Sequence, residues 1–138
     1  MWKLSTKGRY GSRLMVELAL NYGKGSMLLK DIAHQEDISE GYLEHIIPLL
    51  KAAGLIHSAR GAHGGYVLAR PPEAITLKEI VQALEGSLAP VECVDTPSVC
   101  TRTKCCVTRD VWTELKDSIT KTLEKVSLKD MVVKQKKK

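Results

Sequence analysis

The stretch SEGYLEHIIPLLKAA (residues 39–53) predicts the helix around which this chain folds. Ser39 is placed as an N-cap, because its hydroxyl can accept a hydrogen bond from a backbone N–H of the first turn. Four apolar residues recur at helical spacing and predict a face turned toward a core: Leu43, Ile46, Ile47 and Leu50. Another face is left to four larger or polar side chains: Tyr42, Glu44, His45 and Lys51.

The residues before this helix, LLKDIAHQEDI (28–38), predict a shorter helix. Leu29, Ile32 and Ala33 fall on one side of it, and a tight link at 37–38 separates the two helices. A short helix, a brief turn and a longer helix are the plan of the helix-turn-helix, whose second helix enters the major groove of DNA.

After Gly54 the pattern changes from helical to alternating. LIHSA (55–59) and YVLAR (66–70) predict two short strands, and the glycine-rich RGAHGG (60–65) predicts the tip of a β-hairpin. After two such helices, this hairpin is interpreted as the wing of a winged helix, and Arg60 at its base suits a minor groove or a phosphate. Taken alone, the pattern also fits an ordinary surface hairpin that carries a cation.

A first helix is expected from about Ser5 to Tyr22, with an apolar and aromatic stripe at helical spacing. The stretch STKGR (5–9) at its start combines hydroxyls, N–H groups and cations. Lys7 and Arg9 are therefore candidates for a clamp on a DNA phosphate. The alternative is that they are solvated surface residues.

Thr76 and Glu79 have the spacing of a capping box, which predicts a short helix ending near Gly86. Residues 87–106 show neither a helical nor a strand period. A loop of about twenty residues in a compact domain is usually functional or disordered, and the cysteines in this one favour a function.

Residues 107–126 predict a long helix with one apolar stripe: Val111, Trp112, Leu115, Ile119, Leu123 and Val126. Two partners fit this stripe, the first helix of the same chain or the same helix of a second subunit. The second is favoured and predicts a homodimer. Ser127 and Asp130 predict the cap of a last short helix, followed by a disordered tail.

The predicted fold is mostly α with a small β-hairpin: a winged helix-turn-helix followed by a long C-terminal dimerisation helix. Four segments are expected: a DNA-binding domain at 1–86, a cysteine-rich loop at 87–106, the dimerisation helix and a short helix at 107–134, and a disordered basic tail at 135–138. A chain of 138 residues suits one compact domain, although a small helical regulator can complete its core by dimerising.

The distribution of charge says more than the net charge of +5, because four C-terminal lysines supply most of that charge. Residues 1–70 hold nine Lys or Arg against six Asp or Glu, whereas residues 71–105 hold three against five. A basic head followed by a slightly acidic middle fits a face that meets phosphates. No apolar run approaches the roughly 20 residues that span a bilayer, and the N-terminus lacks the apolar stretch of a signal peptide. We therefore expect no membrane association and a cytoplasmic location.

All four cysteines lie in one short stretch, Cys93, Cys100, Cys105 and Cys106, with the spacing C-x6-C-x4-C-C. In a reducing compartment clustered thiols favour metal or redox chemistry over structural disulfides. Zinc usually takes paired C-x2–4-C knuckles, and these cysteines do not form two such pairs. Wider gaps in an irregular loop suit thiolates around an iron–sulfur cluster. Ordinary free thiols remain the alternative.

Several motifs together resemble one family: LSTKGRYG (4–11), ISEGYLEHIIPLLKAAGLI (38–56), RGAHGGYVLAR (60–70) and the cysteines of 93–106. The chain resembles the Rrf-type winged-helix transcription factors, and among them the iron–sulfur cluster regulator (IscR) group. This resemblance covers nearly the whole chain. It implies a dimeric, sequence-specific DNA-binding regulator, expected to be a repressor, that senses iron–sulfur cluster or redox status.

The resemblance also implies a metal site. In the IscR group three loop cysteines hold a 2Fe-2S cluster with a nearby histidine, and Cys93, Cys100 and Cys106 match those cysteines. The usual histidine position is Arg109 here, and an arginine stays protonated and cannot ligate iron. The fourth ligand would then be Cys105, which is the candidate, or another protein group, a residue of a partner subunit or a small molecule.

The expected DNA contacts lie on the first helix, the recognition helix and the wing: Lys7, Arg9, Ser39, Tyr42, Glu44, His45, Arg60, Gly61 and Gly64. A glutamate at position 44 can accept a hydrogen bond from cytosine N4, and Arg60 would enter the minor groove. These two residues are the strongest matches to the family pattern. The four histidines, all within the first 63 residues, are interpreted as surface or DNA-facing residues.

Two other functions fit parts of the sequence. A regulator resembling the cysteine-metabolism repressor (CymR) group would lack the loop cysteines and respond to a protein partner or to thiol redox state, and the four cysteines disfavour it. An iron–sulfur carrier or thiol enzyme with an incidental winged helix would protect no specific DNA site. No catalytic constellation is recognisable, so we do not expect an enzyme.

Overall fold

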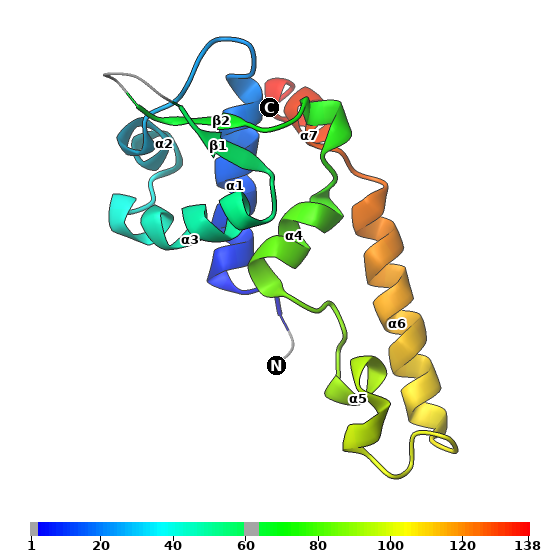
Figure 1. Cartoon of the computed structure of the whole chain (residues 1–138). Helices are drawn as coiled ribbons and strands as arrows, with labels where there is room; N and C mark the ends of the chain where they lie inside the picture. The colour runs from blue at the N-terminus through cyan, green and yellow to red at the C-terminus, as the bar shows by residue number, and fades with distance from the viewer. Residues whose placement is uncertain (1–2, 60–63) are drawn as a thin grey trace.

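The computed structural model describes residues 3–59 and 64–138. The elements in chain order are α1 (Thr6–Leu20), α2 (Leu29–Glu36), α3 (Glu40–Ala52), β1 (Ile56–Ser58), β2 (Tyr66–Leu68), η1 (Pro72–Ala74), α4 (Leu77–Glu85), α5 (Glu92–Asp95), η2 (Pro97–Val99), α6 (Val107–Glu124) and α7 (Leu128–Lys136). Figure 1 shows a head built from α1 to α4, the hairpin and α7, with α6 and α5 extending away from it.

The helix predicted over residues 39–53 is confirmed within one residue at each end. Ser39 is the N-cap of α3, and its hydroxyl accepts a hydrogen bond from the backbone N–H of Tyr42 at 3.1 Å. The predicted apolar stripe of α3 is entirely buried: Leu43, Ile46, Ile47 and Leu50. Burial of such side chains contributes about 1.5–3 kcal/mol each, so packing against α1 and α4 fixes which face of α3 points outward.

The link between α2 and α3 is as tight as the sequence predicts. Asp37 adopts a left-handed conformation with φ of 54°, which Asp tolerates better than most residues. The N–H of Ile38 then donates to the carbonyl of Ala33 at 3.0 Å, and this closes the C-terminus of α2. The chain therefore passes from α2 to α3 through only residues 37–39.

The predicted hairpin is present, with strands shorter than the segments 55–59 and 66–70. β1 and β2 are antiparallel, with Ile56 opposite Leu68 and Ser58 opposite Tyr66. The backbone of Met27, just before α2, also exchanges two hydrogen bonds with Tyr66, at 2.8 and 3.0 Å. The hairpin is thus fastened to the helix-turn-helix at a point that the sequence pattern did not indicate.

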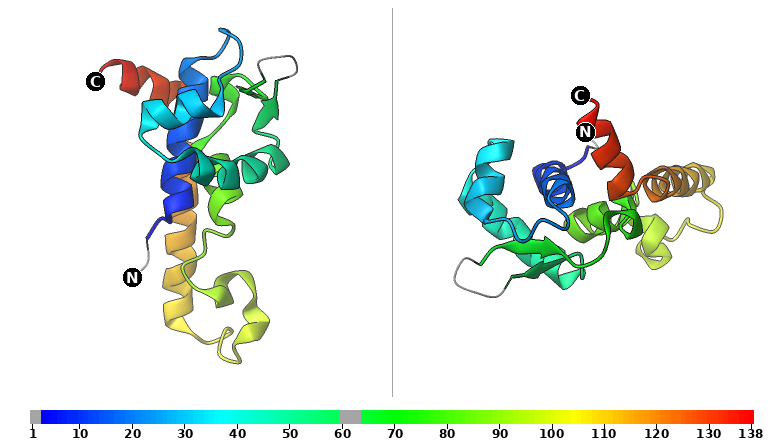
Figure 2. Two further views of the ribbon diagram at one scale, coloured as in Figure 1. Left: turned by 90° about the vertical axis from the view of Figure 1, so that its left-hand side faces the viewer. Right: turned by 90° about the horizontal axis from the view of Figure 1, so that it is seen from above.

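Two glycines allow α1 and α4 to pack closely. A Cβ atom on Gly11 would lie 2.4 Å from Leu84 Cδ1, inside any normal contact distance. Gly8, one turn earlier, faces Glu85 at the end of α4. Figure 2 shows α1 end-on in its second view, between α2 on one side and α7 on the other.

The capping boxes of α4 and α7 are confirmed at Thr76 with Glu79 and at Ser127 with Asp130. The C-terminus differs from the expectation. α7 continues through Lys136 and so includes two residues of the segment 135–138 that was expected to be disordered. The helix is held by Leu128 and Val132, which are buried in the same core as α1.

α6 matches the long helix predicted from the apolar stripe. None of its 18 residues, all of which the structure describes, is buried. Within the protomer, α6 packs against α4 and α5. The expected loop at 87–106 is also more ordered than predicted, since it contains the short helices α5 and η2. In the part of the chain that the structure describes, no helix is long and apolar enough to cross a membrane.

Candidate DNA-binding face and cysteine segment

Two of the residues predicted to contact DNA are solvent-exposed on the outward face of α3. Glu44 and His45 are both exposed, one turn after the N-cap. Glu44 lies between two hollows of about 430 and 470 Å³ that separate α3 from the hairpin, and Tyr66 lines both of them. An exposed acceptor on a rigid helix, flanked by open space, is suited to meeting the edge of a base.

Tyr42 and Ser39 are less free than the sequence suggested. Tyr42 is half-buried, and its ring packs edge-on against Tyr10 of α1 with the ring centres 5.5 Å apart. The oxygen of Ser39 is already the N-cap acceptor, which leaves its hydroxyl proton to donate. Both residues therefore position α3, and Tyr42 connects it to α1.

Lys7 and Arg9 are exposed on the first turn of α1, as expected. The guanidinium of Arg9 lies 5.5 Å from the centre of the Tyr10 ring, and the guanidinium of Arg13 lies at the same distance. This arrangement gathers cations beside the aromatic contact between α1 and α3. It suits contact with a phosphate next to the groove that α3 would enter.

The backbone donors of the proposed phosphate clamp are already occupied. The N–H groups of Ser5 and Gly8 donate to the carboxylate of Glu85, and the hydroxyl of Ser5 does the same. The expectation that these donors are available to a phosphate is corrected here. The side chains of Lys7 and Arg9 are exposed and keep that role as a prediction.

Arg13 connects α1 to the end of α2, a role that sequence reasoning missed. Its Nε donates to Glu36 Oε1 at 2.7 Å, and its terminal nitrogen donates to the carbonyl of Glu36. Burial raises the pKa of the neighbouring Glu17 to about 7, and a hydrogen bond and like charge from Glu36 add to the increase. The junction of α1 and α2 therefore holds a carboxyl group that titrates near neutrality.

Arg60, Gly61 and His63 lie outside the described residues. Gly64, next to them, has φ of 59°, and its carbonyl accepts a hydrogen bond from the hydroxyl of Ser26 at 2.8 Å. At the other side of the hairpin, Lys51 Nζ lies 2.8 Å from the hydroxyl oxygen of Ser58, which ties the end of α3 to β1. The hairpin is therefore held to the head from both sides.

The four cysteines all lie in residues 87–106, named here the cysteine segment, but they do not gather around one point. Cys93 and Cys106 are half-buried, whereas Cys100 and Cys105 are exposed. Within residues 3–59 and 64–138, no group of three or more Cys, His, Asp or Glu side chains is placed to hold a metal ion. The thiols have the soft donor chemistry that an iron–sulfur cluster needs, and in this arrangement no three of them, all within the described residues, are placed together to hold a metal ion.

Cys106 is nevertheless in an environment that favours a thiolate. It precedes α6 directly, and the hydroxyl of Thr108 lies 3.1 Å from its sulfur. This contact lowers the pKa of the thiol, with further lowering from the backbone N–H groups of Arg109 and Thr108. A thiolate at a helix N-terminus is a common feature of metal-binding and redox-active cysteines.

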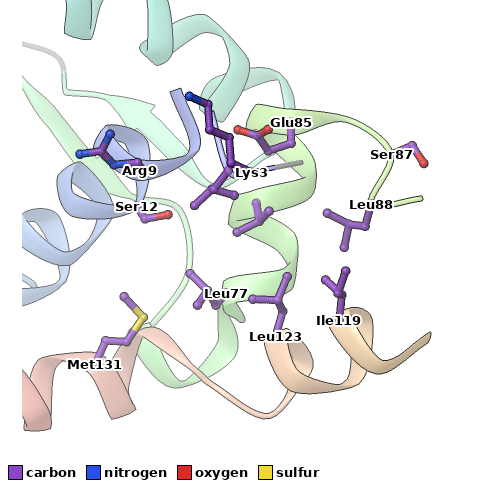
Figure 3. Close-up of a pocket in the computed structure, with 12 residues that line it drawn as sticks. Lys3, Arg9, Ser12, Leu77, Glu85, Ser87, Leu88, Ile119, Leu123 and Met131 are labelled. Carbon is purple, nitrogen blue, oxygen red and sulfur yellow. The ribbon is translucent and has the colours of Figure 1, made fainter. Parts of the chain in front are cut away.

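An apolar groove lies between the head and α6 (Figure 3). Its volume is about 460 Å³. Leu77 on α4 and Ile119 and Leu123 on α6 line one side, and Lys3, Arg9 and Glu85 lie on the other. Arg9 thus lines this groove, and its guanidinium lies beside the Tyr10 ring.

A helix-turn-helix, an antiparallel hairpin after it and an outward helix with polar side chains define a winged-helix transcriptional regulator. The chain belongs to the Rrf2 family, described as iron-dependent transcriptional regulators, whose model matches residues 4–134. It is 41% identical over 129 residues to the HTH-type transcriptional regulator CymR of Bacillus subtilis, a match that covers 94% of this chain and 88% of that protein. The family is one of regulators and not of enzymes.

Two solved structures are equally similar in fold. The structure of CymR, the global cysteine regulator of B. subtilis, has a TM-score of 0.79 and 41% identity, covering 96% of this chain and 98% of that one. The structure of IscR of T. potens also has a TM-score of 0.79 and 41% identity, covering 97% and 88%. Overall similarity therefore does not assign the chain to either group.

Proposed function

We propose that this protein is a homodimeric, sequence-specific DNA-binding transcriptional regulator, acting as a repressor, whose cysteine segment is its sensor. The observation that carries the DNA-binding role is the outward face of α3, where Glu44 and His45 are exposed while the opposite stripe is buried. Rigid burial on one side is what lets a recognition helix present fixed side chains to base edges.

In the proposed complex Glu44 accepts a hydrogen bond from cytosine N4, and His45 reaches a neighbouring base or phosphate. Lys7 and Arg9 contact the backbone, which fixes the register of the helix. Ser39 and Tyr42 contribute at the start of α3, with Ser39 donating to a phosphate.

The wing completes the DNA contact in this proposal. Arg60 enters the minor groove, and Gly61 and Gly64 let the backbone approach the duplex closely. The segments divide the work: 1–86 reads DNA, 87–106 senses, 107–134 dimerises and 135–138 is a basic extension. A regulator of this kind works where the chromosome is, so we expect a cytoplasmic location.

The dimer is supported by the unpartnered surface of α6. Val107 is 75% exposed, Val111 50% and Trp112 37%. These apolar side chains continue the stripe whose other end, at Ile119 and Leu123, lines the groove of Figure 3. A second copy related by twofold symmetry would cover both surfaces at once, which is the usual solution for an exposed stripe on a long helix.

The sensor is proposed to hold a 2Fe-2S cluster with Cys93, Cys100 and Cys106 as ligands and Cys105 as the candidate fourth. The soft donor set and the thiolate-favouring site of Cys106 support this assignment. Because no three of the thiols, all of which the structure describes, are placed together, the cysteine segment must rearrange before it can bind the cluster. The second candidate is a cluster-free regulator of cysteine metabolism, responding to a protein partner or to thiol oxidation, and the similarity to CymR favours it.

The test of the DNA-binding role begins with selection from a random duplex pool by the full chain, followed by footprinting on the selected site. A regulator protects a roughly palindromic site, whereas a carrier or thiol enzyme protects none. Anaerobic purification with iron and sulfide counts then separates the two sensor candidates. Near two of each per chain supports the cluster, and a colourless protein even after reconstitution supports the cluster-free regulator.

A further inference from the structure

The carboxylate of Glu85, at the C-terminal end of α4, closes the N-terminus of α1. The backbone N–H groups of Ser5 and Gly8 donate to Glu85 Oε1 at 3.3 and 3.1 Å, and the Ser5 hydroxyl donates to the same oxygen. Gly8 permits this approach, because a Cβ there would lie 2.5 Å from that oxygen. Figure 3 shows Glu85 beside Lys3, on the side of the groove that Arg9 also lines. A negative charge at this position is favourable for the helix dipole.

A second set of polar contacts begins two residues later. The hydroxyl of Ser87 donates to the carboxylate of Asp95, which also accepts a hydrogen bond from Lys116 Nζ at 2.8 Å. Asp95 belongs to α5, two residues after Cys93. These two bonds connect Ser87, just after α4, to α5 and α6. Only Gly86, with φ of 81°, lies between the two sets of contacts.

We propose that Glu85 is a positioning residue that links the cysteine segment (residues 87–106) to the N-terminus of α1. When the segment rearranges, Asp95 moves, and Ser87 carries that movement across one residue to the carboxylate that holds α1. Lys7 and Arg9, on the first turn of α1, change position as a result. The importance of this link for regulation rests on the proposed DNA-binding function.

The link can act as a switch because the two arrangements of the cysteine segment would place the N-terminus of α1 differently, and so would differ in DNA affinity. The side chain of Glu85 contributes through the donors it holds and does not itself contact DNA. Ser87 is suited to testing it, because replacing a hydroxyl with hydrogen changes no charge. Any effect of Ser87→Ala at Gly8 must then travel through Glu85 or the adjoining backbone.

The first measurement is amide hydrogen exchange of Gly8 by NMR, on the full chain. We expect Ser87→Ala to speed this exchange by roughly three- to tenfold, the loss of one hydrogen bond being spread over the link. Ser98→Ala, at an exposed serine of the same segment, is the matched control and should leave the exchange unchanged. Equal exchange in the two variants would overturn the proposal.

A double-mutant cycle separates a link from two independent effects. In a Glu85→Ala background Ser87→Ala should have no further effect on Gly8 exchange, whereas additive effects would contradict the link. Glu85→Gln, which keeps the shape of the side chain, provides a second background if the alanine variant folds poorly. Circular dichroism confirms that each variant is folded.

The same variants are tested for DNA affinity with a mixed-sequence duplex of about 30 base pairs, long enough for two half-sites. Ser87→Ala should weaken binding about threefold relative to Ser98→Ala, and this difference should vanish in the Glu85→Ala background. If the wild-type chain binds no DNA while Gly8 exchange still responds to Ser87→Ala, the proposed function fails and the link stands. If DNA binds and neither readout responds, the link is wrong.

Discussion

Arg109 Nε donates a hydrogen bond to the backbone carbonyl of Cys93, with the two atoms 3.1 Å apart. Arg109 stands on the first turn of α6, and Cys93 lies on α5, sixteen residues earlier. The contact fastens the backbone of the first cysteine of the segment to the start of the long helix. The position at which the resemblance expects a histidine ligand is therefore filled by a structural contact of this chain.

Replacing Arg109 with histidine should raise iron retention, because an imidazole can ligate iron and a guanidinium cannot. We expect Arg109→His to hold iron and sulfide longer than the wild-type chain when air is admitted after anaerobic reconstitution, as followed by the visible absorption. Arg109→Ala is the control, since it breaks the contact with Cys93 without adding a ligand. Equal decay in the histidine and alanine variants would show that position 109 contributes no ligand.

Glu44→Ala should weaken binding to the selected operator and relax its base preference at one position. A well-placed contact to a base edge is worth about 1–3 kcal/mol of discrimination, so that the loss corresponds to roughly 5- to 150-fold. Fluorescence anisotropy with the operator and with duplexes substituted at each cytosine measures it. Gln82→Ala, at an exposed position of α4, serves as the control. An unchanged base preference would remove Glu44 from the readout.

Val111→Asp should convert the dimer to a monomer. The side chain is 50% exposed in the single chain, so the substitution leaves the fold of the protomer intact but buries a charge in the proposed interface. Sedimentation velocity measures the mass, and circular dichroism verifies the fold. Asp117→Lys, on the exposed opposite side of α6, should leave the dimer intact. A dimer that survives Val111→Asp would place the interface elsewhere.

Stability should fall as pH rises through neutrality because of Glu17. Its pKa in the folded chain is about 7, raised from 4.5 mainly by burial, so the folded state binds the proton more tightly than the unfolded state. This contribution is fully present below pH 4.5 and is lost as the pH rises through 7. After allowance for solvent screening we expect a loss of about 1–2 kcal/mol between pH 5 and 8.

Urea unfolding of the wild-type chain and of Glu17→Gln at several pH values isolates the contribution of Glu17 to the free energy of unfolding. The amide cannot titrate, so the difference between the two chains should change with pH in that window while other titrating groups cancel. Asp95 and Asp130 do not interfere there, since their lowered pKa values place their contribution above pH 3.8, to be lost only on further acidification. Parallel curves for the two chains would assign the carboxyl an ordinary pKa.

The sequence contained most of the fold because the signals are local. The N-cap at Ser39, the capping boxes at Thr76 and Ser127 and the apolar stripe of α3 each depend on residues within a few turns of one another. The hairpin followed from alternation around a glycine-rich turn. Local patterns say less about where a helix ends, and α7 extends further than the lysine-rich tail suggested, since lysine is a good helix former.

The candidate site was found only in part from the sequence, because its contacts join distant residues. Nothing in the sequence pairs Arg13 with Glu36, which lies 23 residues further along the chain. Lys7 and Arg9 lie exposed at the start of α1, and their contact with a phosphate stays a prediction. Glu85, eighty residues from Ser5, occupies the donors of Ser5 and Gly8. A signal was available in Gly8 and Gly11, since two glycines one turn apart often mark a close helix contact.

By itself, the sequence determined a winged helix-turn-helix with an outward recognition helix, a cysteine segment and an amphipathic long helix, because periodicity and capping are properties of neighbouring residues. Only the tertiary structure decided that Glu85 closes α1, that Arg109 holds the backbone of Cys93 and that no three of the four described thiols come together as metal ligands. These depend on how α4, α5 and α6 pack, and packing brings together side chains whose separation along the chain carries no local signal.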